Sequence, residues 1–244
     1  MSRRTKFFLI HLFLCFCIAI LLLGSAYLIW YPHPLAQAVG AVKIFVLILI
    51  VDVIVGPLLG FLVYKENKKS LKFDLCTIFI FQFFALGYGI YNLAEGRPSW
   101  IVYNVDQFEL IKKNDLLIDN VRDVDKKFSQ ESWLGPQYVA VTRAKDKKQQ
   151  EDDLFAEAIG GISIAQRPER YVELNNVKKQ MQERAQQLAK LKKFNEASQV
   201  DLILEQYPKA NAWLPLKSNV LDMVVLVNKE SASIIKIVDL RPWK

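Results

Sequence analysis

Cysteine and histidine are absent from residues 92–244, although the whole chain has three cysteines and two histidines. Their absence argues against the usual zinc sites, Ser-His-Asp hydrolases and thiol oxidoreductases in this region. The three cysteines lie within apolar runs, at Cys15, Cys17 and Cys76. We therefore expect no disulfide framework in residues 92–244. His11 lies inside an apolar run, where packing or a hydrogen bond to a neighbouring helix is its expected role.

Nucleotide-binding fingerprints are also missing, because neither G-x-x-x-x-G-K-[ST] nor G-x-G-x-x-G occurs. The chain has 25 acidic residues, but their spacing singles out no carboxylate pair for acid–base chemistry. We expect neither an enzyme nor a bound cofactor or metal. The net charge of +7 does not indicate nucleic-acid binding, because many of the basic residues flank apolar runs.

Long apolar runs dominate the first 91 residues, at 7–30, 42–64 and 75–91. A helix needs roughly 20 apolar residues to cross a lipid bilayer, and the third run is at the short end of the range. The sequence predicts three transmembrane helices. The first run exceeds the core of a secretion signal and ends in aromatic residues, so we expect it to stay as an anchor.

Basic residues predict the orientation. The N-terminus carries Arg3, Arg4 and Lys6, and the 65–74 loop carries four lysines, whereas the 31–40 loop carries no lysine or arginine. The N-terminus and the 65–74 loop are thus expected on the cytoplasmic side of the membrane. Three crossings then place residues 92–244 on the opposite, external side.

Residues 92–244 show mixed strand and helix patterns. We expect strands at 100–111 and 138–144, a solvated loop or helix start at 144–153, and an amphipathic helix from Pro168 to Asn195. "LDMVVLV" and "ASIIKIVDL" predict two C-terminal strands joined by a short turn. The predicted fold class is membrane-anchored α+β: a membrane domain, 1–91, and a small sheet-plus-helix domain, 92–244.

Asp52 is the only acid in the second run, where a charge at the membrane centre costs roughly 2.5–3.5 kcal/mol. Gly56 and Gly60 follow at i+4 and i+8, so all three residues share a helix face. The G-x-x-x-G spacing lets another helix approach closely. Pro57 lacks an N–H group and is expected to leave the carbonyl of Val53 without a donor.

Gln82 is predicted at the same membrane depth as Asp52. The sequence leaves two roles open for the acid. One is a structural hydrogen bond between Asp52 and Gln82, and the other is a contact with a polar group of another membrane protein.

The chain resembles the TfpX/TfpZ-type type IV pilin accessory proteins. The resemblance covers about 42–110 and the last 25 residues, through "VDVIVGPLLG", "KFDL", "FQFFALGYGIY", "RP" and "LDMVVLVN…SIIKIVDLRPW". The matching positions are Asp52, Gly56, Pro57, Asp74, Gln82, Tyr88, Gly89, Arg97 and Pro98. The resemblance implies a protein of the bacterial inner membrane, with residues 92–244 in the periplasm, that helps pilin subunits reach or stay on the surface. Three crossings distinguish the chain from a pilin, which has one N-terminal apolar helix.

On this basis the type IV major pilin is the expected partner. Its helix would contact Asp52, Gly56, Pro57, Gly60, Gln82, Tyr88 and Gly89, with Arg97 and Pro98 as a structural junction, while residues 92–244 touch its head. Self-association through the membrane helices is possible. A membrane-anchored sensor with an external ligand-binding domain is the alternative, although its longest cytoplasmic segment would be ten residues. A transporter fragment would need to oligomerise.

Overall fold

The computed structural model describes residues 1–117, 124–144 and 146–244. These residues form two compact units. The first, the helical unit, contains residues 1–36 and 40–96, and the second, the sheet unit, contains residues 37–39 and the described residues from Arg97 to the C-terminus.

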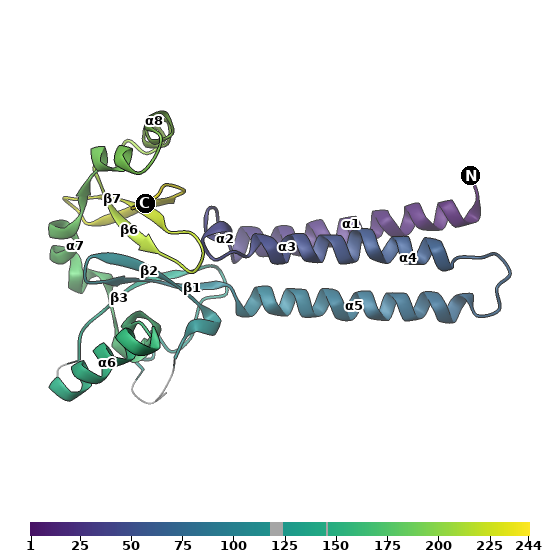
Figure 1. Ribbon diagram of the computed structural model, residues 1–244, viewed down its shortest axis with the longest axis horizontal. Helices are drawn as coiled ribbons and strands as arrows, with labels where there is room; N and C mark the ends of the chain where they lie inside the picture. Colours follow the sequence, from purple (N-terminus) through teal and green to yellow (C-terminus); the bar gives the residue numbers. More distant parts are fainter. Residues whose placement is uncertain (118–123, 145) are drawn as a thin grey trace. The chain divides into compact units, whose positions relative to one another are not determined.

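Three long helices build the helical unit (Figure 1). They are α1 (Arg3–Ile29), a continuous helix over Val42–Val63, and α5 (Leu71–Glu95). The continuous helix consists of α3 (Val42–Leu49), the π-helical turn η1 (Ile50–Val55) and α4 (Gly56–Val63). Each of the three is long and apolar enough to cross a membrane, which confirms the predicted number of membrane helices.

The third membrane helix is longer than its apolar run. Asp74 lies in the first turn of α5, where it accepts a hydrogen bond from Ser70 and lies 2.6 Å from the Lys68 ammonium group. An acid near a helix N-terminus also interacts favourably with the helix dipole. The helix therefore begins before its apolar run, in a turn whose polar contacts a hydropathy pattern does not reveal.

An eight-stranded mixed sheet forms the centre of the sheet unit, in the order β4-β3-β1-β2-β6-β7-β8, with β5 also paired to β6. The strands are β1 (Pro98–Asn104), β2 (Gln107–Lys112), β3 (Gln137–Val141), β4 (Tyr171–Val172), β5 (Gln186–Gln187), β6 (Ala212–Lys217), β7 (Met223–Asn228) and β8 (Ser233–Val238). This sheet, with its accompanying helices, confirms the predicted α+β class.

Helical segments connect the strands. The α-helices are α6 (Lys147–Gly160), α7 (Lys178–Arg184) and α8 (Ala197–Glu205), and a short helix α2 (Leu35–Ala38) lies in the connection between the first two membrane helices. The 3-10 helices among the described residues are η2 (Lys113–Asp115), η4 (Ile164–Gln166), η5 (Pro168–Arg170), η6 (Leu174–Val177) and η7 (Leu188–Lys193).

The single strand predicted over 100–111 is wrong, because the segment is the β1–β2 hairpin. Asn104 pairs with Gln107, so the chain reverses at Val105 and Asp106. Val105 has a φ of 56°, a conformation that is strained for a β-branched residue. The turn therefore lacks the glycine or asparagine that normally marks such a position.

The long helix predicted from Pro168 to Asn195 is also wrong. Its one α-helical part is α7, and 3-10 turns and the short strands β4 and β5 occupy much of the remainder. Ala185 is extended, and Gln186 then pairs with Trp213 of β6. Strand pairing thus interrupts a pattern whose periodicity favours a continuous helix.

Other predictions are confirmed. Strand β3 lies within the predicted 138–144 apart from its first residue. The segment 144–153, predicted as a loop or helix start, contains the beginning of α6. The predicted C-terminal pair of strands is β7–β8. Asp146 caps α6 by accepting a hydrogen bond from the Gln149 N–H group. Strand β6 and helix α8 were not predicted.

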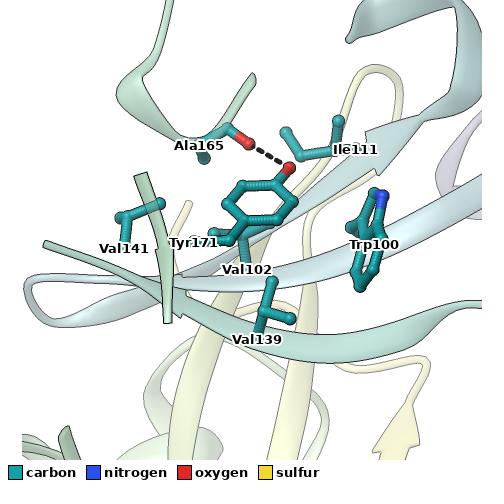
Figure 2. Close-up of a cluster of buried hydrophobic side chains, with 7 residues drawn as sticks. All are labelled: Trp100, Val102, Ile111, Val139, Val141, Ala165 and Tyr171. Atoms are coloured by element: carbon teal, nitrogen blue, oxygen red, sulfur yellow. Dashed lines mark hydrogen bonds between the residues drawn. The ribbon is translucent and has the colours of Figure 1, made fainter. Parts of the chain in front are cut away.

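One core cluster of the sheet unit is shown in Figure 2. The Tyr171 and Trp100 rings meet edge to face at 5.3 Å, and the Tyr171 hydroxyl donates to the Ala165 carbonyl at 2.7 Å. A second cluster surrounds Trp213, with Leu191, Val200 and Leu226 among its buried members. The two clusters lie at opposite ends of the strand order.

Candidate functional site

Asp52 lies in the π-helical turn of the second membrane helix, and its side chain is buried. Pro57 changes the hydrogen bonding of this part of the helix. In the π turn the Gly56 N–H group donates to the carbonyl of Val51, five residues back. The corresponding donor for the Asp52 carbonyl would be residue 57, but proline has no N–H group. The Asp52 carbonyl is therefore left without this helical donor.

Gln82 of α5 supplies the missing donor. Its Nε2 atom donates to the Asp52 carbonyl oxygen at 3.2 Å. The expected proximity of Asp52 and Gln82 is thus present, but the bond goes to the main chain and not to the carboxyl group. The sequence predicted that Pro57 would leave the Val53 carbonyl without a donor. In the π turn the carbonyl that lacks its helical donor is instead that of Asp52, one residue earlier, and Gln82 bonds to it.

Gln82 also reaches the first membrane helix. Its Oε1 atom lies 3.1 Å from His11 Nε2, and its Nε2 atom lies 3.6 Å from Cys15 Sγ. A carboxamide oxygen only accepts, so His11 Nε2 is the donor in this pair. The expected hydrogen bond from His11 to a neighbouring helix is confirmed. One side chain therefore links all three membrane helices.

Glycines make this arrangement possible. A Cβ atom on Gly56 would lie 1.8 Å from Gln82 Nε2, and one on Gly60 would lie 3.1 Å from His11 Nδ1. On α5, a Cβ atom on Gly89 would lie 2.6 Å from Ile48 Cγ1. The face that the sequence assigns to a partner helix is thus occupied at Gly56 and Gly60 by the chain's own side chains.

The Asp52 carboxyl group differs from its main chain in having no such partner. The residue is 6% exposed, and neither carboxyl oxygen has a hydrogen-bond partner within the residues that the structure describes. Buried polar groups are normally hydrogen-bonded, so a pair of unpaired oxygens requires an explanation.

Two apolar grooves meet at Asp52. The Tyr88 groove, of about 360 Å³, runs between α3–η1 and α5 and is lined by Leu47, Ile48, Asp52, Ala85, Tyr88 and Gly89, among others. The His11 groove, of about 310 Å³, is lined by residues of α1 and α5 together with Asp52. Tyr88 is 70% exposed. The structure therefore brings Asp52, Tyr88 and Gly89 to one groove and places Gly56, Pro57 and Gly60 in the interior.

Arg97 and Pro98 lie at the beginning of the sheet unit. The buried Arg97 side chain stacks over the Trp133 ring at 4.5 Å, and a terminal nitrogen lies 3.8 Å from Glu131. Pro98 pairs with Lys112 in the β1–β2 hairpin. Arg97 therefore positions the 131–133 segment. The sequence did not indicate this contact.

Apolar side chains are also exposed on the sheet unit. Trp133 and Leu134 are 61% and 84% exposed. On α6, Leu154, Phe155 and Ile159 are exposed as well. Across the described ranges, no group of three or more His, Cys, Asp or Glu side chains is arranged to hold a metal ion.

The chain is similar to curated fimbrial assembly proteins of Dichelobacter nodosus. The serogroup E1 protein is 33% identical over 188 residues, which is 75% of this chain and 73% of that protein. The serogroup I protein is 32% identical over the same coverage. The protein of serogroups C1 and C2 is 36% identical over 46% of this chain and 87% of its own length.

No family model matches the chain, and no solved structure matches it. The identity and coverage shared with the serogroup E1 protein nevertheless extend over most of both chains. Taken with the three apolar helices and the α+β sheet unit, they establish the relationship: this chain belongs to the family of fimbrial assembly proteins.

Proposed function

We propose that this protein is a non-enzymatic accessory protein of type IV pilus biogenesis, of the TfpX/TfpZ type, that binds a pilin in the bacterial inner membrane. Binding would modulate pilus assembly or retraction and so set the amount of pilin at the surface. The names of the Dichelobacter nodosus relatives support a role in fimbrial assembly. The major pilin is the proposed partner.

The Tyr88 groove is the observation that carries this proposal. A pilin awaiting assembly is held in the membrane by one apolar helix, which requires a complementary apolar surface at membrane depth. The groove offers such a surface between α3–η1 and α5, with Asp52 in its lining. Gly89 contributes by having no side chain where Ile48 packs. Gly56, Pro57, Gly60 and Gln82 hold the helices that form the groove.

The sheet unit supplies the second proposed contact. In the orientation expected from the basic residues, it lies in the periplasm on the same side as a pilin head. Trp133 and Leu134 are exposed there, and Arg97 holds the segment that carries them. Exposed aromatic residues are common anchors in protein interfaces. We assign the pilin head to this surface.

Site-specific photo-crosslinking in the native membrane tests the proposal. A photoreactive amino acid at position 88 is expected to capture the major pilin through its apolar helix. Position 81 is the matched control, because Phe81 and Tyr88 are both 70% exposed on α5, but Phe81 lines neither of the two grooves at Asp52. Equal pilin capture at both positions, or capture only of further copies of this chain at position 88, would contradict the proposal.

A groove-filling substitution connects the groove to function. Ala85→Phe places a ring in the Tyr88 groove and is expected to reduce surface pilin at unchanged protein level. Phe81→Ala serves as the control at the exposed face. Normal surface pilin in the Ala85→Phe strain would count against the groove as the pilin site.

A further inference from the structure

We infer that the occupant of the Tyr88 groove is an apolar membrane helix that carries one hydrogen-bond donor, placed so that it bonds to the Asp52 carboxyl group. This rests on the proposed function and adds the chemistry by which the partner is recognised. The starting point is the pair of unpaired Asp52 oxygens, on a residue that is 6% exposed.

The strong donors close to Asp52 are already used. One Gln82 N–H group bonds to the Asp52 carbonyl and the amide nitrogen also approaches Cys15 Sγ. A primary carboxamide has two N–H donors, so these contacts account for its capacity. His11 Nε2 donates to Gln82 Oε1, and the neutral ring then has an acceptor at Nδ1. Among the described residues, these hydrogen bonds therefore leave the carboxyl group to be satisfied by a donor from outside the chain.

Lipid does not supply this donor. The hydrocarbon core of a bilayer has no hydrogen-bonding groups, and water is scarce there. Asp52 lies near the middle of the Val42–Val63 helix, within the part expected to cross that core. A donor that reaches Asp52 laterally through an apolar groove must be carried by another apolar segment. A serine or threonine hydroxyl, a carboxamide or an amine on a membrane helix has this chemistry.

The inference holds for either protonation state of Asp52. An ionised carboxylate accepts through both oxygens, and a protonated carboxyl group retains acceptor capacity. A cationic donor would favour the ionised form, whereas a hydroxyl or amide donor serves both forms. The charge of the donor is therefore what the substitutions below distinguish.

Asp52→Leu is the decisive variant. It introduces an apolar side chain of similar size and removes both acceptors. Pilin affinity is therefore expected to fall at least tenfold, measured with the purified major pilin and the full chain in nanodiscs. The variant itself should be at least as stable as the parent, because it loses an unpaired buried carboxyl group. Thermal unfolding in the same nanodiscs checks this and separates a binding role from a structural one.

Asp52→Asn then reports the donor's charge. Asparagine keeps one acceptor oxygen, so retention of most of the affinity identifies a neutral donor, and a loss equal to that of Asp52→Leu identifies a cation. The donor itself is found by replacing each polar residue of the pilin helix with alanine. The correct replacement should weaken binding to the parent protein and have no further effect on Asp52→Leu.

The outcomes separate this inference from the proposed function. If Ala85→Phe abolishes pilin binding while Asp52→Leu binds as tightly as the parent, the pilin uses the groove without a bond to Asp52, and the inference is overturned. If neither substitution changes the affinity, the groove is not the pilin site and both proposals are overturned. If Asp52→Leu alone lowers the stability, a structural role for the carboxyl group replaces the inferred one.

Discussion

Gln82 and Asp52 are joined through the main chain of the acid: the Gln82 amide donates to the Asp52 carbonyl oxygen at 3.2 Å. A side chain on α5 thereby completes the hydrogen bonding of another helix, at the position where Pro57 removes a donor. The Asp52 carboxyl group takes no part in this bond. The main chain of this residue thus takes the structural bond, whereas its side chain is the group to which we assign the proposed recognition role.

Gln82→Leu should destabilise the helical unit. It removes the donor of the Asp52 carbonyl and the acceptor of His11, leaving buried polar groups unpaired, at a cost of about 1–3 kcal/mol. The measurement is the free energy of unfolding of the full chain in a mild detergent. Phe81→Leu is the control on an exposed part of the same helix. A Gln82→Leu stability equal to that of the control would show that other donors replace the amide.

Pro57→Ala should make Gln82 less important. Alanine restores an N–H group at position 57, which can donate to the Asp52 carbonyl in the π register. Gln82→Leu is then expected to cost less by about 0.5–1 kcal/mol in the Pro57→Ala background than in the parent, a typical size for coupled neighbours. A double-mutant cycle in the same unfolding assay measures the difference. Strict additivity would rule out the explanation given for the Gln82 bond.

Gly56→Ala should destabilise the protein, whereas Gly87→Ala should not. A methyl group on Gly56 would lie 1.8 Å from Gln82 Nε2 and must displace that side chain, which costs about 1–3 kcal/mol. Gly87 has no atom within 4 Å of the same added group. Alanine there should be neutral or stabilise the helix by up to about 1 kcal/mol. Equal unfolding free energies for the two variants would contradict the packing described at Gly56.

The sheet unit should lose stability at alkaline pH through Tyr103. Burial raises the pKa of the Tyr103 hydroxyl from 10.0 to about 12, and nearby Asp106 contributes to this rise. Between these pH values the unfolded chain releases the proton first, so the folded state binds more protons and the unfolding free energy falls as pH rises. The slope of this fall approaches about 1.4 kcal/mol per pH unit. Below the unfolded pKa both states keep the proton, so the titration of Tyr103 does not change the unfolding free energy there.

Tyr103→Phe provides the comparison for this pH dependence. The variant loses the bond to the Val105 carbonyl at neutral pH but also loses the titrating group. Its unfolding free energy in detergent should therefore fall less steeply above pH 10 than that of the parent. Parallel curves would place the alkaline sensitivity elsewhere in the chain.

Hydropathy and alternation predicted the parts of this fold that depend on local pattern. The three membrane helices follow from long apolar runs, and the β7–β8 pair follows from two apolar stretches with a short polar turn. The β1–β2 reversal was missed because Val105, with a φ of 56°, takes a conformation that its residue type disfavours. Long-range pairing decided the region before β6, where Gln186 pairs with Trp213 against the local helical periodicity.

The candidate site was predictable in its composition but not in its connections. An acid, two glycines and a glutamine at matching depth indicated that Asp52 and Gln82 lie together. The atoms that pair depend on the π turn, which no residue type specifies by itself. The sequence also did not predict which of these residues are exposed. Gly56 is buried against Gln82 and Tyr88 is exposed because of how α5 packs against the second helix.

The join between β2 and β6 has a consequence for how the protein is made. These two strands pair in parallel through Phe108 with Leu216 and Glu109 with Lys217. Synthesis runs from the N-terminus, so the ribosome completes β2 long before residues 212–217 exist. During that interval the edge of β2 that later pairs with β6 has no strand partner, and Phe108 lacks its register partner Leu216. An unpaired strand edge can pair with other chains, so this edge of β2 is open to aggregation until residues 212–217 have been synthesised.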